Sequence, residues 1–105
     1  MRTSKALDIT EAQFERQVKD LASLFGWEYY HTWKSYHSPA GFPDSVLVNT
    51  EQQRTIFAEL KSEAGQPSPE QYEWLVALTE AGNETYLWRP SDFDEVAAIL
   101  RGDSI

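Results

Sequence analysis

The sequence contains no cysteine and only one methionine, and none of its apolar runs approaches the roughly 20 residues that a membrane-spanning helix requires. The lack of cysteine excludes disulfide bonds, cysteine-ligated zinc and thiol nucleophiles. The first ten residues carry two positive charges but no apolar segment, so we expect no secretory signal there. These absences favour a cytoplasmic setting with no membrane partner.

Positive charge is also scarce. The chain has 9 Lys and Arg against 17 Asp and Glu, for a formal net charge of −8. Taken alone, this acidity disfavours a nucleic-acid partner. The charge is unevenly divided, however: residues 1–61 hold 7 basic and 8 acidic side chains, whereas residues 62–105 hold 2 basic and 9 acidic ones. The first part of the chain is therefore nearly balanced.

What the chain does contain is enough apolar material for one core. Its 105 residues are 41% hydrophobic and 13% aromatic, a composition that disfavours a disordered chain. A chain of this length is too short for a kinase or a barrel enzyme. We expect a single domain over residues 1–105, with its core at about 10–100.

The pattern of the first half predicts one helix followed by three strands. A capping box at Thr10 and Gln13 begins a helix over about 10–25, whose apolar residues recur at helical spacing up to Gly26. An aromatic strand is predicted over 27–33, followed by a loop over 34–43 that is rich in Ser, Pro and Gly. Further strands are predicted over 45–48 and 55–61.

The second half predicts a helix, a strand and a last helix. Ser68, Pro69 and Gln71 are typical of a helix start, and this helix ends near Gly82. A strand is predicted over 85–88, and a helix capped by Ser91 extends to about 100. The strands at 45–48 and 55–61 are nearly continuous apolar runs, which favours helices on both faces of the sheet. The fold class is therefore α/β, a small mixed sheet flanked by helices.

Three ionisable side chains converge in the predicted hairpin. A turn centred between residues 51 and 52 places opposite one another the residues whose numbers sum to 103: Val48 and Thr55, Val46 and Phe57, and Asp44 and Glu59. Lys61 lies two residues beyond Glu59 and so shares its face. The hairpin therefore predicts two carboxylates and one ammonium group at the same end of an apolar ribbon.

Two adjacent carboxylates repel and require a cation. Oxygen ligands suit Mg²⁺ or Mn²⁺, and the carbonyl group of Leu60 is a natural further ligand. Lys61 is suited to orient a water molecule or to neutralise charge that develops on phosphorus. These are the components of phosphodiester hydrolysis, although carboxylates and a lysine at strand ends also occur as an ordinary solvated rim, and the residues alone leave both interpretations open.

The linked motifs add specificity. Gly41-Phe42-Pro43-Asp44, then Ala58-Glu59-Leu60-Lys61, then Gln71 early in the next helix resemble the PD-(D/E)xK nuclease motif, in particular the small stand-alone, phage-type form of its VRR-NUC branch. The resemblance implies a restriction-endonuclease-like αβββαβ core followed by a C-terminal helix. It also implies that Asp44 and Glu59 bind Mg²⁺ or Mn²⁺ and that Lys61 assists the attacking water.

The resemblance further implies a glutamate on the first helix and a glutamine on the next. Glu11 lies on the inward face by its spacing from Phe14, so we prefer it as an additional metal ligand, with Glu15 as the alternative. Either residue also suits an ordinary first helical turn. Gln71 lies on the inward face of its helix, where it can bond to the site or only complete the capping box with Ser68; both roles stay open.

The function implied is a metal-dependent endonuclease that cuts DNA, including branched DNA such as Holliday junctions, as a homodimer in a phage or bacterial setting. His31, Lys34, Ser35 and Arg16 are candidate substrate contacts. The family's Val-Arg-Arg stretch is absent and basic residues are few, so we expect DNA binding to be weak, metal-dependent and salt-sensitive. The alternatives are an inactive nuclease-fold module that binds nucleic acid or protein, and an acidic module that binds a basic partner.

Overall fold

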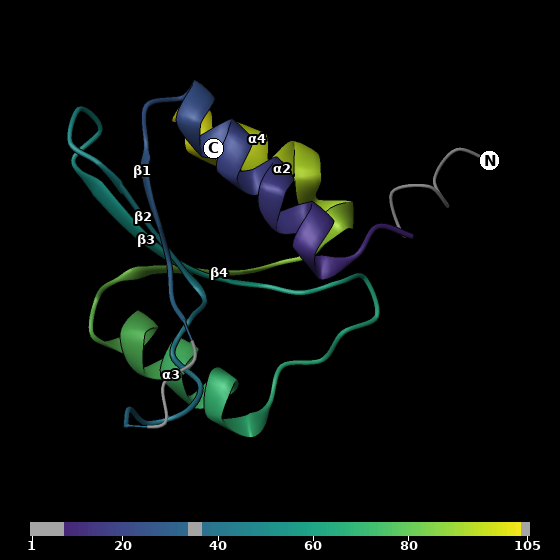
Figure 1. Cartoon of the computed structure of the whole chain (residues 1–105). Coiled ribbons are helices and arrows are strands. Elements are labelled where there is room, and N and C mark those ends of the chain that lie inside the picture. The colour runs from purple at the N-terminus through teal and green to yellow at the C-terminus, as the bar shows by residue number, and fades with distance from the viewer. Residues whose placement is uncertain (1–7, 34–36, 104–105) are drawn as a thin grey trace.

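The computed structural model describes residues 8–33 and 37–103. Its elements follow the predicted order of helix, three strands, helix, strand and helix (Figure 1). In chain order they are α2 (Glu11–Leu24), β1 (Glu28–His31), β2 (Ser45–Asn49), β3 (Arg54–Leu60), α3 (Pro69–Glu80), β4 (Glu84–Trp88), the short 3-10 helix η1 (Pro90–Asp92) and α4 (Phe93–Arg101).

The four strands form one mixed sheet in the order β1-β2-β3-β4. β1 pairs with β2, and β2 with β3, in antiparallel fashion, whereas β3 and β4 are parallel. A parallel pair needs a crossover connection, and here α3 supplies it. The predicted α/β class with a small mixed sheet is confirmed.

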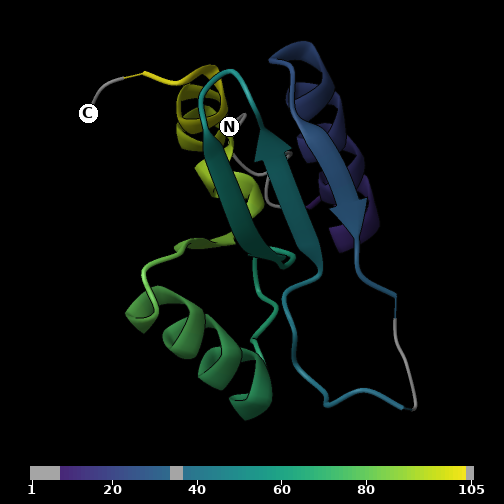
Figure 2. The same ribbon diagram turned by 90° about the vertical axis from the view of Figure 1, so that its left-hand side faces the viewer.

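The two faces of the sheet are covered unequally. Helices α2 and α4 lie together on one face, and α3 lies apart from them beside β3 and β4 (Figures 1 and 2). The core lies under α2 and α4, and includes Phe14, Val18, Leu47, Ile56, Val96 and Leu100. On the other face Val46 and Phe57 are only half-buried, and no residue of α3 is fully buried. Helices therefore lie on both faces, as expected, but α3 covers its face less completely than α2 and α4 cover theirs.

The predicted hairpin register is confirmed. Val48 pairs with Thr55 and Val46 pairs with Phe57, as turn symmetry requires. The strand ladder ends one pair later, and the chain continues into Asp44, whose backbone carbonyl accepts a hydrogen bond from the amide of Thr32 at 2.8 Å. This bond fixes the backbone of Asp44 against the end of β1.

Both predicted capping boxes are present, at Thr10 with Gln13 and at Ser68 with Gln71. The start of the last helix differs from the prediction. Ser91 does not cap it but lies inside η1, and the Asp92 side chain accepts a hydrogen bond from the amide of Arg89 at 2.9 Å. Pro90 begins this 3-10 turn because its ring fixes a helical φ without needing an amide partner. In the described ranges, no helix is long and apolar enough to cross a membrane.

Candidate active site

The end of the β2–β3 hairpin brings Asp44, Glu59 and Lys61 together. Glu59 points from the last part of β3 and is 1% exposed. The Asp44 carboxylate accepts hydrogen bonds from the amide of Leu60 at 3.2 Å and 3.4 Å, through its two oxygens. Lys61 Nζ lies 3.6 Å from Glu59 Oε2. The register inferred from the sequence thus brings these three side chains to one place.

Both carboxyl groups resist ionisation. Burial raises the pKa of Glu59 to about 8, the negative charge of Asp44 adds to this rise, and Lys61 opposes it. Burial likewise raises the pKa of Asp44 to about 6, against the lowering effect of the hydrogen bond from Leu60, and the charge of Glu11 raises it further. Two carboxyls with raised pKa values in one partly buried place form an electrostatic site for a cation.

Gln71 performs both of the roles that the sequence left open. Its Oε1 accepts a hydrogen bond from the amide of Ser68 at 2.8 Å, which completes the capping box. Its Nε2 donates to Glu59 Oε2 at 2.8 Å. The other oxygen of Glu59, Oε1, is buried and has no hydrogen-bond partner among the described residues. One side chain therefore connects the start of α3 to the acidic pair and leaves one carboxylate oxygen open.

The two candidate glutamates of α2 lie in different surroundings. Glu11 is exposed at the start of α2, and its charge acts on Asp44. Glu15 is half-buried, and its Oε2 lies 2.7 Å from His31 Nδ1 and accepts a hydrogen bond from the Tyr29 hydroxyl at 3.4 Å. Glu15 is thus the glutamate with direct contacts to β1.

A chain of contacts links Glu15 to Asp44 through two residues that the sequence analysis did not single out. The hydroxyl groups of Tyr29 and Ser45 are 2.7 Å apart, and Ser45 donates to Asp44 Oδ1 at 3.2 Å. Burial raises the pKa of the Tyr29 phenol, so its proton is held. The signals available in the sequence were the position of Ser45 directly after Asp44 and the two-residue spacing of Tyr29 from His31.

The candidate substrate contacts are placed in part. His31 ends β1, and its ring makes an edge-on contact with Trp33 at a centroid distance of 5.4 Å. Arg16 is exposed on α2, and no described residue forms an ion pair or hydrogen bond with it. Lys34 and Ser35 lie outside the described residues.

The donor set fits a hard divalent cation. Asp44 and Glu59 supply carboxylate oxygens, and the buried Oε1 of Glu59 accepts no hydrogen bond from a described residue, so in the ionised form of the pair it is an open acceptor that a cation would satisfy. Within residues 8–33 and 37–103, no three His, Cys, Asp or Glu side chains gather closely enough to hold a metal ion by themselves. The side chains already in contact are therefore a pair, Asp44 and Glu59, and further oxygen ligands would complete the coordination of an ion.

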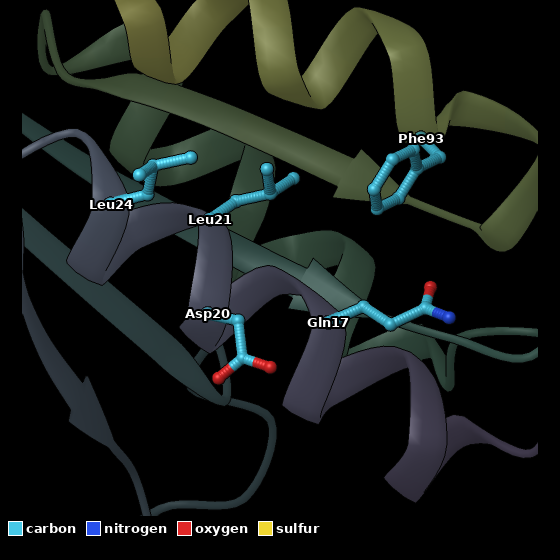
Figure 3. Close-up of a pocket in the computed structure, with 5 residues that line it drawn as sticks. All are labelled: Gln17, Asp20, Leu21, Leu24 and Phe93. Atoms are coloured by element: carbon cyan, nitrogen blue, oxygen red, sulfur yellow. The ribbon is translucent and has the colours of Figure 1, made fainter.

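A separate pocket lies between α2 and α4 (Figure 3). It has a volume of about 250 Å³ and is lined by Gln17, Asp20, Leu21, Leu24 and Phe93. None of the candidate site residues lines it, so it has no part in the chemistry of the acidic pair.

The mixed sheet, its flanking helices and the acidic pair beside a lysine correspond to a small α/β nuclease core. Comparison with protein families matches residues 7–91 to the VRR-NUC domain. The chain therefore belongs to the VRR-NUC domain family, a nuclease-type family, as the sequence motifs implied. A comparison with curated proteins found no match. The matched range includes Asp44, Glu59, Lys61 and Gln71.

Proposed function

We propose that this protein is a metal-dependent endonuclease that hydrolyses phosphodiester bonds of DNA at the end of the β2–β3 hairpin. The observation that carries the proposal is Glu59. Its carboxyl is buried beside Asp44, Gln71 holds one of its oxygens, and the other oxygen has no partner in the described part of the chain. An arrangement that costs folding free energy without a ligand is typical of a functional site.

Asp44, Glu59 and the carbonyl oxygen of Leu60 would hold Mg²⁺ or Mn²⁺ in this proposal, with Glu11 as a further ligand. A bound ion of this kind polarises a phosphoryl oxygen and makes a water molecule more acidic. The hydrogen bonds from Leu60 and Ser45 orient the Asp44 carboxylate. They keep its oxygens in place before a ligand arrives, which lowers the cost of ordering the site.

Lys61 and Gln71 act on the other side of the acidic pair. Lys61 is mostly buried and lies 3.6 Å from Glu59, which supports a role in which its ammonium group holds the attacking water by a hydrogen bond or neutralises charge on phosphorus. Gln71 keeps Glu59 in one orientation by its bond to Oε2. It acts as a positioning residue and does not need to touch the substrate.

The finer substrate assignment is branched DNA, such as a Holliday junction, cut by a homodimer. One chain carries one acidic pair, so symmetric cleavage of two strands needs two copies. Sedimentation of the protein alone and with a four-way junction tests this stoichiometry. A monomer that cuts junction arms symmetrically would contradict it.

The activity test incubates the protein with Mg²⁺ or Mn²⁺ and a panel of linear, flap and four-way junction DNA. We expect cleavage that Asp44→Asn or Lys61→Ala reduces at least 100-fold, because each removes a charge that the reaction needs. Asp20→Asn, the same change at an exposed site of α2, is the matched control and should cleave normally. Absence of cleavage of every DNA at high protein and metal concentration would reject the nuclease in favour of an inactive binding module.

Calorimetric titration with Mn²⁺ tests the metal site without any substrate. We expect binding to the unaltered protein and none to Asp44→Asn or Glu59→Gln, with Asp20→Asn again as the control. Because both carboxyls must ionise to bind, the affinity should rise between pH 6 and pH 8. Equal binding by all four proteins would show that the acidic pair is not the metal site.

A further inference from the structure

A large aromatic side chain stands in solvent at the end of the sheet that carries Asp44. Trp33 is 79% exposed, the highest value among the large hydrophobic residues of the described chain. The residue before it, Thr32, donates its amide to the backbone carbonyl of Asp44 at 2.8 Å. The indole therefore lies one residue from a backbone bond that is shared with a proposed metal ligand.

The ring is held from one edge. The rings of Trp33 and His31 have centroids 5.4 Å apart and planes at 87°, and His31 Nδ1 lies 2.7 Å from Glu15 Oε2. Isolated exposed hydrophobic residues are common and need no explanation. Trp33 differs from Leu24 on α2, which is also 71% exposed, because its ring rests against His31, which itself contacts Glu15, while most of the indole stays in water.

The described part of the chain has few cations available for phosphates. Of its six Lys and Arg residues, four are engaged by acceptors of the protein itself: Arg54 by Glu84, Lys61 by Glu59, Arg89 by the carbonyl of Gly65, and Arg101 by Asp103. Arg16 and Lys19 remain, both on α2. Phosphate contacts supply most of the affinity of ordinary DNA-binding proteins. Stacking of a base on an aromatic ring needs no cation and is a second source of affinity.

We infer that Trp33 is a base-stacking residue that takes an unpaired nucleobase next to the scissile phosphate. The inference rests on the proposed nuclease function and deepens it, because it names the substrate class. Bases inside a continuous duplex present no free face to a surface side chain, whereas single strands and the unpaired bases at a branch do. Among branched DNA, the inference therefore favours substrates with unpaired bases beside the cut, such as a flap or a junction opened at its branch point.

The test measures binding of labelled single-stranded oligothymidylate and of a duplex of equal length, by fluorescence anisotropy in metal-free buffer. Loss of one stacked base predicts that Trp33→Ala weakens single-strand binding by about 5- to 150-fold, and that Trp33→Phe retains most of it. Leu24→Ala is the control, since Leu24 is a similarly exposed apolar residue, at 71%, in the last turn of α2. It should bind as the unaltered protein does, and duplex binding should not depend on Trp33.

Three results of the binding assay would overturn the inference: no single-strand binding by the unaltered protein, equal binding by Trp33→Ala, or equal losses for duplex and single strand. Because Trp33 is exposed, we expect the melting temperature of Trp33→Ala to stay close to that of the unaltered protein. This result would exclude a folding effect. Parallel cleavage assays separate this inference from the proposed function. If Trp33→Ala cleaves DNA as well as the unaltered protein does, the nuclease function is supported and the stacking role of Trp33 is rejected. If single-strand binding depends on Trp33 but no DNA is cleaved, the stacking role is supported and the nuclease function is rejected.

Discussion

Gln71 offers a way to measure the coupling between α3 and the acidic pair, because a matched residue exists elsewhere in the chain. Gln13 completes the capping box of α2 with Thr10 just as Gln71 completes that of α3 with Ser68. Gln71 additionally donates to Glu59. Substituting each glutamine by alanine removes the same capping contact in both helices, and removes the site contact in one of them only.

The expected magnitudes follow from these contacts. Each substitution loses one hydrogen bond to an N-cap amide, worth about 1 kcal/mol. Gln71→Ala also leaves the buried Oε2 of Glu59 without its 2.8 Å donor, with Lys61 Nζ at 3.6 Å as the remaining neighbour. A lost bond to a charged group costs about 1.5–3 kcal/mol. We therefore expect Gln71→Ala to destabilise the protein by about 2 kcal/mol more than Gln13→Ala above pH 8, where Glu59 is ionised.

Urea denaturation of both variants at pH 5 and pH 9 measures this difference. The excess cost of Gln71→Ala should shrink to about 1 kcal/mol at pH 5, because the protonated carboxyl is a weaker acceptor. For a domain of about a hundred residues, each kcal/mol corresponds to roughly 4–8 °C in melting temperature. The coupling would be refuted if the two variants lost the same free energy of unfolding, within about 0.5 kcal/mol, at both pH values.

Two further predictions concern the same region. Burial raises the pKa of Asp44 from 3.8 to about 6 and that of Glu59 from 4.5 to about 8, so the stability that these groups contribute to the metal-free protein is fully present below pH 4 and is lost as pH rises to 8. Denaturation from pH 4 to 9 should show this fall, and Asp44→Asn with Glu59→Gln should remove it. Gly41 has a φ of +98°, and an added Cβ would lie 2.6 Å from the carbonyl carbon of Glu70, whereas Gly82 at +96° has open space. Melting curves should therefore show that Gly41→Ala costs at least about 1 kcal/mol more than Gly82→Ala; equal costs would contradict the close approach.

The sequence predicts most of the fold because local signals agree with one another. The capping boxes at Thr10 and Ser68 fix where two helices begin, and symmetric pairing about the turn fixes the hairpin register. These are short-range effects, and nothing else in the chain competes with them. The same register is what brings Asp44 toward Glu59, so the centre of the candidate site follows from the hairpin alone.

The α2 side of the site depends on tertiary packing that spacing does not reveal. Helical periodicity favours Glu11 as an inward residue, but Glu11 is the first residue of the helix and the buried stripe begins only at Phe14. Glu15, one position off that stripe, instead meets His31 and Tyr29. Contacts between a helix and an edge strand depend on how the helix is rotated on the sheet, which the sequence pattern does not specify.

The second sheet face is covered by a helix only in part, for a related reason. Continuous apolar strands predict burial on both sides, but α3 packs through only a few side chains, such as Trp74 against Phe42 at a centroid distance of 5.1 Å. Val76 on this helix remains exposed. The length of the connection between β3 and β4 allows one helix, and a single twelve-residue helix cannot cover the whole face.

The acidity of the chain and the chemistry of its site belong to one electrostatic argument. Above pH 8, where both carboxyls are ionised, a phosphodiester that approaches Asp44 and Glu59 meets negative charge from both, and no arginine of the described chain acts on either group. Lys61 is the cation in contact there, and it faces Glu59 alone. A divalent ion held by the pair would offset the negative charge at the site, and the formal charge of −8 does not include such an ion. On this reasoning the proposed metal is required for the substrate to approach the site as well as for the reaction, and an uncharged indole such as Trp33 is a contact that an acidic protein can offer DNA without repelling it.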